Sequence, residues 1–198
     1  MPATITIRDG MRMVDMSGLG LTAGGGPYVT GSDNEPERAT FGAGIIGLSL
    51  GATPTDIVTI AGAAGKVIRV KSLIFNGNSA TLAAYPIALI RRSTANTGGT
   101  SSVVVGRAHD TLDGASAATL TTYTANATAL GTAVGTLHTG RVIAATASNL
   151  DRLILQYSWQ NDKSIVLRGA SDILAINMQG VTLSAATTMD VDLMWTEE

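Results

Sequence analysis

The sequence of 198 residues contains no cysteine, and only 4% of its residues are aromatic. The missing thiols exclude disulfides, thiol nucleophiles and thiolate metal sites, and they fit a protein that folds in a reducing compartment. Sugar-binding β-proteins usually present exposed aromatic side chains. Tyr157, Trp159 and Trp195 instead share strand faces with leucines. We therefore expect these aromatics in the core, which weakens the case for a lectin.

Charge is also scarce, because charged residues make up 14% of the chain and the net charge is −2. A nucleic-acid-binding protein concentrates Lys and Arg on one face to neutralise phosphates, and no such concentration is present. No run of about 18 apolar residues occurs, as a membrane span would need. The N-terminus also lacks the basic-then-apolar order of a signal peptide. We expect neither nucleic acid nor a membrane as a partner, and no cofactor.

Short segments rich in Val, Ile, Leu and Thr recur along the chain, separated by clusters of Gly, Asn, Asp and Ser, which is typical of β-strands and turns. The expected strands cover residues 56–61, 66–75, 86–92, 101–107, 118–124, 135–144 and 153–159, with three more in 163–198. The connections are too short for the crossover helices of a parallel sheet. We therefore predict an all-β fold, an antiparallel β-sandwich of the jelly-roll kind.

The last strand has the clearest pattern. Its apolar residues alternate with polar ones at the two-residue period of a half-buried strand: Met189, Val191, Leu193 and Trp195 on one face, and Asp190, Asp192 and Thr196 on the other. A chain that ends in such a strand must hold it inside a sheet, so we expect no tolerance to trimming. The aspartate spacing suits a calcium pair, but further oxygen ligands are not evident, which favours a solvated face.

Residues 1–50 differ from the remainder, since they are rich in glycine and contain Met1, Met11, Met13 and Met16. Ordering such a segment costs roughly 1–2 kcal/mol per residue in backbone entropy. We predict an N-terminal arm and Gly-rich linker over 1–50, and a β-sandwich domain over 51–198. The alternative is that Ile5, Ile7 and Val14 add an edge strand to the domain's own sheet.

Residues 114–140 contain no Lys, Arg, Asp or Glu. A stretch of this length without charge is rarely a freely solvated loop. It is either strand material inside the fold, as the alternation around Leu120 suggests, or a surface covered by another subunit.

Two catalytic patterns occur in the Gly-rich region. Residues 42–47 match the dinucleotide fingerprint GxGxxG, and residues 47–51 match the nucleophile elbow GxSxG with Ser49 at its centre. Both patterns need a strand before them and a helix after them, and neither flank qualifies. His109 and His138 are the only histidines and lack a surrounding set of carboxylates. We therefore predict no enzyme activity and no catalytic, cofactor or metal site.

Residues 123–135, 165–180 and 194–198 together resemble a group of tailed-bacteriophage virion proteins that look like small jelly-roll decoration or head-fibre proteins. The resemblance implies a capsid decoration (cement) protein that is made in the host cytoplasm and attaches to the outside of the head. The implied partners are the major capsid protein and the chain itself, as a homotrimer. The alternative is a tail, baseplate or fibre component that contacts the host surface.

The arm is expected to supply the capsid contact, because adaptable methionines suit a surface that must fit several environments. The predicted contact residues are Ile5, Ile7, Met11, Met13, Met16, Leu19 and Leu21. On this basis, removing residues 1–50 would leave a folded β-domain that no longer binds capsids.

Overall fold

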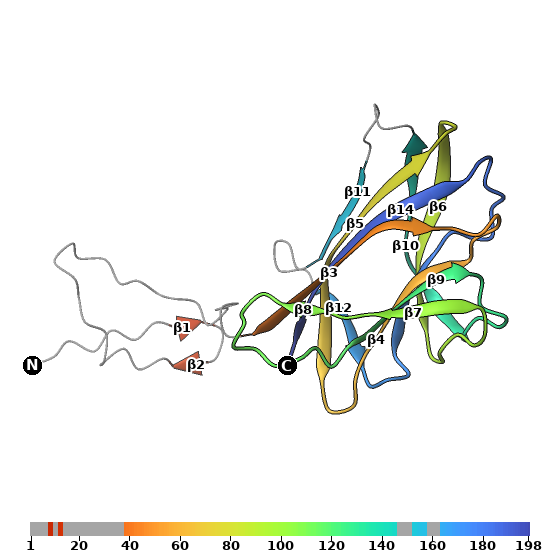
Figure 1. Ribbon diagram of the computed structural model, residues 1–198. Coiled ribbons are helices and arrows are strands. Elements are labelled where there is room, and N and C mark those ends of the chain that lie inside the picture. The colour runs from red at the N-terminus through yellow and green to blue at the C-terminus, as the bar shows by residue number, and fades with distance from the viewer. Residues whose placement is uncertain (1–7, 10–11, 14–37, 146–151, 158–162) are drawn as a thin grey trace, which may run out of the picture. The chain divides into compact units, whose positions relative to one another are not determined.

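The computed structural model describes residues 8–9, 12–13, 38–145, 152–157 and 163–198 (Figure 1). It divides into two compact units, residues 1–37 and 38–198. In the described part of the first unit, β1 (Arg8–Asp9) pairs antiparallel with β2 (Arg12–Met13). All regular elements in the described residues of both units are strands, which confirms the predicted all-β class.

The second unit contains twelve strands in one hydrogen-bonded sheet. They are β3 (Ala39–Ser49), β4 (Asp56–Ala61), β5 (Val67–Ser79), β6 (Ala83–Arg92), β7 (Thr100–Val104), β8 (Arg107–Ala108), β9 (Thr119–Ala125), β10 (Ala133–Ala145), β11 (Arg152–Gln156), β12 (Ile165–Arg168), β13 (Ile173–Asn177) and β14 (Thr187–Glu197). The order is β7-β9-β4-β13-β6-β10-β5-β14-β3-β8, and β11 and β12 also pair with β5. Each strand predicted beyond residue 55 therefore has a counterpart.

The sheet is mixed and curled (Figure 1). Its one parallel pair among the described strands joins Ala144 and Ala145 of β10 to the end of β5, while the other pairs are antiparallel. β7 and β8 lie at opposite ends of the strand order, yet only Val105 and Gly106 separate them in the sequence. The two ends of the sheet must therefore come close together, which curls the sheet around its core.

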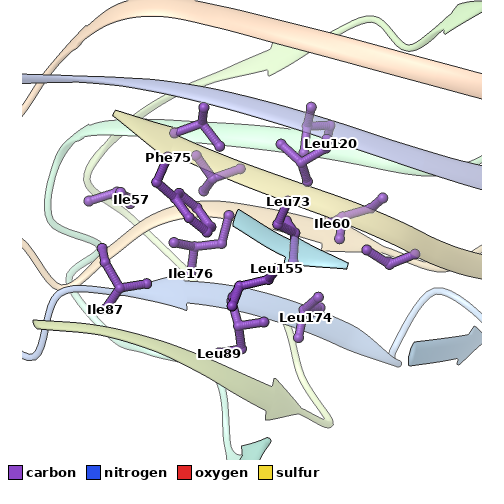
Figure 2. Packing of buried hydrophobic residues seen from close by; sticks show 14 of the residues in the cluster. Ile57, Ile60, Leu73, Phe75, Ile87, Leu89, Leu120, Leu155, Leu174 and Ile176 are labelled. Atoms are coloured by element: carbon purple, nitrogen blue, oxygen red, sulfur yellow. The ribbon is translucent and has the colours of Figure 1, made fainter. Parts of the chain in front are cut away.

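Apolar side chains from both halves of the sheet meet in a single buried cluster (Figure 2). Leu73 and Phe75 of β5 lie among side chains from β4, β6, β9, β11 and β13, which are Ile57, Ile60, Ile87, Leu89, Leu120, Leu155, Leu174 and Ile176. In β5, β6 and β13 these residues stand two positions apart, as expected when one face of a strand turns toward the core, whereas β4 is buried on both faces and contributes Ile57 and Ile60. The curled sheet thus buries its own inner face.

The C-terminal strand lies inside the sheet, between β3 and β5, as predicted. Met189, Leu193 and Trp195 are fully buried, and the Trp195 ring stacks on Phe41 with centroids 6.1 Å apart. Thr196 differs from the prediction, because it is buried rather than on a solvated face. Tyr157 packs against the core, where burial raises its pKa to about 12, and Trp159 lies outside the described residues.

Part of the predicted linker is a strand. β3 pairs with β14 along nearly its whole length, and its Phe41 and Leu48 are buried in the core. Glycine weakens a strand considered alone, which is why this segment resembles a linker in sequence. The sheet therefore begins at Ala39 rather than at residue 51, and the GxGxxG pattern lies within a β-strand.

The predicted strand 101–107 is split into β7 and β8 by Gly106. A Cβ atom at Gly106 would lie 2.4 Å from the Trp195 ring, so only glycine allows the backbone to cross there. This close crossing lets the chain pass from one end of the sheet to the other directly over the buried tryptophan.

Hydrogen bonds of polar groups also hold the end of β14 in place. The Glu197 carboxylate accepts hydrogen bonds from the Ser116 hydroxyl, the Trp195 indole and the amides of Ala117 and Ala118. Burial by itself would raise the pKa of Glu197, but these hydrogen bonds together lower it below its usual value of 4.5. The carboxylate therefore stabilises the fold in its ionised form.

We expect this arrangement to make the protein sensitive to acid. Because the pKa of Glu197 is lower in the folded than in the unfolded chain, its stabilisation is complete above about pH 4.5 and is lost as the pH falls through the folded value. Melting temperature measured from pH 6 to pH 3 should decline more steeply for the wild type than for Glu197→Gln. The half-buried residue Asp113 supplies the control, since its side chain makes no hydrogen bond or ion pair with another described residue and Asp113→Asn should keep the wild-type slope. Equal slopes for all three proteins would contradict this role of Glu197.

A buried ion pair between the start of β4 and the end of β6 connects the sheet to two loops. Arg92 of β6 donates to both carboxylate oxygens of Asp56 at 2.7 and 2.8 Å, and both side chains are buried. Asn96 and Asn177 also donate to Asp56, and Arg92 donates to the carbonyl of Gly131. Every oxygen of the carboxylate thus has partners, as a buried charge requires.

Candidate functional site

Two β-bulges shape the outer surface of β10. Its register with β6 shifts between Ala133 and Gly135 and again between Thr136 and His138, so Val134 and Leu137 are the extra residues. A bulge breaks the alternation of a strand and redirects a side chain. Val134 is 65% exposed and Leu137 is 47% exposed, although both are apolar. The bulges therefore hold two apolar side chains out toward solvent.

A third bulge lies in β3. Ile46 and Gly47 together stand opposite the single residue Asp190 of β14, and Ile46 is 91% exposed. Gly47 has a φ of 64°, which favours glycine, and its amide donates to the Asp190 carboxylate at 2.7 Å. Asp190 thus holds the bulge in place. In the part of the chain that the structure describes, no group of three or more potential ligands could hold a metal ion.

The uncharged stretch 114–140 divides into two parts. Residues 119–125 form β9, in which Leu120 and Tyr123 are buried, as the strand hypothesis predicts. Residues 129–140 are largely exposed and include Leu130 with the two bulged residues of β10. For this second part the other hypothesis, a surface covered by another subunit, stays a prediction.

A hollow of about 440 Å³ lies where β3 approaches the β7–β8 connection. Its lining consists of Gly42, Ala43, Gly44, Val104, Val105, Arg107, Ala108, His109 and Asp192. The His109 ring fits against Gly42, where a Cβ atom would come within 3.1 Å of Nε2. Within the described ranges, the side chains of Arg107, His109 and Asp192 form no hydrogen bond or ion pair, so the three polar side chains of this mostly small and apolar lining are not joined into a hydrogen-bonded group.

Ser49 is not placed for nucleophilic catalysis. It is the last residue of β3, and the nearby hollow of about 200 Å³ is lined by Ser49, Leu50, Asn78, Ser79, Ala80, Ala186, Thr187 and Thr188. No histidine is among these residues. His109 lines the other hollow and His138 lies on β10. The structure therefore does not bring the candidate nucleophile and base into a shared site.

The predicted arm contacts are largely outside the described residues. Met13 lies in β2, where it pairs with Arg8, while Ile5, Ile7, Met11, Met16, Leu19 and Leu21 are not described. Their role in capsid binding stays a prediction. The missing charge of 114–140 did indicate the exposed β10 surface, but its individual residues were not predicted, because bulges depend on the neighbouring strand.

Comparison with known proteins identifies no relative of this chain. No family model, curated protein or solved structure matches it. In the described residues there is also no helix with the length and hydropathy that crossing a membrane requires.

Proposed function

We propose that this chain is a non-enzymatic structural virion protein that decorates and stabilises the outside of a tailed-phage head. The observation that carries the proposal is the largely exposed, uncharged first part of β10, residues 133–140, where bulges display Val134 and Leu137. The resemblance of residues 123–135, 165–180 and 194–198 to phage decoration proteins supports it. The jelly-roll arrangement that this resemblance implies belongs to the same proposal.

The energetics suit an assembly protein. Burying what is still exposed of Val134, Leu137 and the neighbouring Leu130 would contribute roughly 1 kcal/mol each before the costs of association are subtracted. One such contact is weak, but several identical contacts in an oligomer bind together with much higher avidity. A closed homotrimer, in which identical patches cover one another, would use this surface without leaving it exposed.

Location on the particle distinguishes the proposal from its alternative. Antibody directed against this chain should label the whole surface of the phage head in electron micrographs. Label confined to the tail would support a tail, baseplate or fibre component that meets the host. Absence of label from purified particles would exclude both structural roles.

We predict that Val134→Lys combined with Leu137→Lys abolishes trimer formation through β10 and reduces capsid binding at least tenfold. A lysine at each bulge places charge in a surface that assembly would bury, and unpaired buried charge is costly. Solution mass and co-sedimentation with heads lacking the protein measure the two effects. The melting temperature of the double variant should stay near that of the wild type, because both positions are exposed.

Leu112→Lys provides the matched control, since Leu112 is a 92% exposed apolar residue outside this surface. Its mass and capsid binding should equal those of the wild type. If the double variant also kept both properties, the outer surface of β10 would not be the assembly surface.

A further inference from the structure

Several strands of the described sheet have unpaired edges, and most of these edges are protected. The short edge strands β8, β11 and β12 each contain an arginine, namely Arg107, Arg152 and Arg168. The long strand β3 is covered by β8 at one end and carries the Ile46–Gly47 bulge, and β10 carries two bulges. Charges and bulges are the devices by which proteins prevent an edge from pairing with another strand.

β7 lacks these devices from Ser101 onward. It ends the strand order and pairs only with β9, with its sole register shift at the Thr100–Ser101 step. No charged residue occurs between Arg92 and Arg107. Val103 is 67% exposed and the following Val105 is 62% exposed. This is a regular, uncharged and partly apolar edge, which is the kind that accepts an added strand.

The space beside this edge is open. In the portion of the chain that the structure covers, no further backbone hydrogen bond links residues 100–105 to a segment other than β9. Val104 and Val105 border the 440 Å³ hollow, so β3 does not close against this end of the strand. The outward-facing amides and carbonyls of β7 are therefore available to an incoming strand.

We propose that β7 of one molecule pairs antiparallel with β7 of a second copy, so that the sheet continues across a two-fold axis. The segment Thr100–Val104 is complementary to itself, because pairing it with its own copy brings no like charges together. Thr, Ser and Val placed opposite one another across strands are favourable neighbours. Two-fold pairing also covers the β7 edge of both molecules, so neither edge is left for a third copy to pair with.

This contact goes beyond the proposed function, which relies on the different surface of β10. Because each β7 pairs with one other, the assembly contains an even number of copies: two through β7 alone, or six if trimers also form through β10. The pairing of β7 does not depend on where the protein lies on a phage particle. Failure of either proposal therefore leaves the other to be judged separately.

Native mass spectrometry and light scattering of the full chain, from 1 to 100 µM, test the pairing. The wild type should contain an even number of copies, and Val103→Lys should halve that number by placing like charges across the axis. Leu112→Lys should keep the wild-type number. A monomer or an odd number of copies for the wild type at 100 µM, or an unchanged mass for Val103→Lys, would overturn the proposal.

Cross-linking adds a test that does not depend on weakening the contact. The chain has no cysteine, so Ser101→Cys, Ser102→Cys and Val103→Cys each introduce a single thiol. Near a two-fold axis a residue faces its own copy, and mild oxidation should link at least one of these variants into covalent dimers in high yield. Leu112→Cys should stay largely uncross-linked. Equal yields at Leu112 and throughout residues 101–103 would overturn the pairing.

Discussion

Deleting residues 1–50 is expected to prevent folding, whereas deleting residues 1–37 should leave a cooperatively folded domain. The longer deletion removes β3, with the buried side chains of Phe41 and Leu48. Each large buried side chain is worth about 2–5 kcal/mol, and the whole fold is stabilised by only about 5–15 kcal/mol. Removing these side chains together with the β14 pairing therefore takes away a stabilisation comparable to that of the whole fold.

The shorter deletion ends where the second compact unit begins, at Arg38, and keeps every strand of the large sheet. Circular dichroism and thermal melting of the two truncated proteins measure the contrast. If the domain boundary lay at residue 50, as the sequence predicts, both truncated proteins would fold. A cooperative transition in the protein lacking residues 1–50 would show that β3 is dispensable.

Replacing Arg92 by leucine should destabilise the domain by about 3–5 kcal/mol, because it leaves the buried Asp56 carboxylate without its cation. Arg92 also holds the carbonyl of Gly131, which would lose a hydrogen-bond donor. For a domain of this size the melting temperature should fall by roughly 10 °C. Chemical denaturation monitored by tryptophan fluorescence gives the free energy directly.

The matched control is Arg107→Leu, because Arg107 is exposed and makes no hydrogen bond or ion pair with another described residue. That variant should stay within about 0.5 kcal/mol of the wild type. Combining Arg92→Leu with Asp56→Asn should cost less than the sum of the single changes, since the unpaired charge is removed. A loss below about 1 kcal/mol for Arg92→Leu would show that the ion pair contributes little.

Local patterns predicted many of the strands but not the full boundaries of the sheet. The segment Asp56–Ala61 was predicted to the residue, because its β-branched side chains are followed by an Ala-Gly turn region. β3 was missed, because Gly42, Gly44 and Gly47 have no side chains to show alternation. β14 and β8 on its two sides make it a strand, and that pairing is invisible in a local window.

For the two candidate surfaces, too, the sequence predicts one part and the tertiary structure decides the other. The lack of charge in 114–140 indicated that part of this stretch would be buried or covered, and the exposed residues of β10 lie within it. Val134 and Leu137 project outward only because β6 imposes its register on β10. Equally, the uncharged residues of β7 form an edge open to pairing only because the fold places them at the end of the sheet.

The sequence by itself determined the all-β class, many of the strands and the burial of the C-terminal strand. These properties follow from the period and composition of short segments, and each segment carries that information alone. Tertiary structure decided that residues 39–49 join the sheet, that Asp56 meets Arg92, and which side chains the bulges expose. Each of these depends on a partner far away in the chain, and the free energy of such contacts arises only when both segments are brought together.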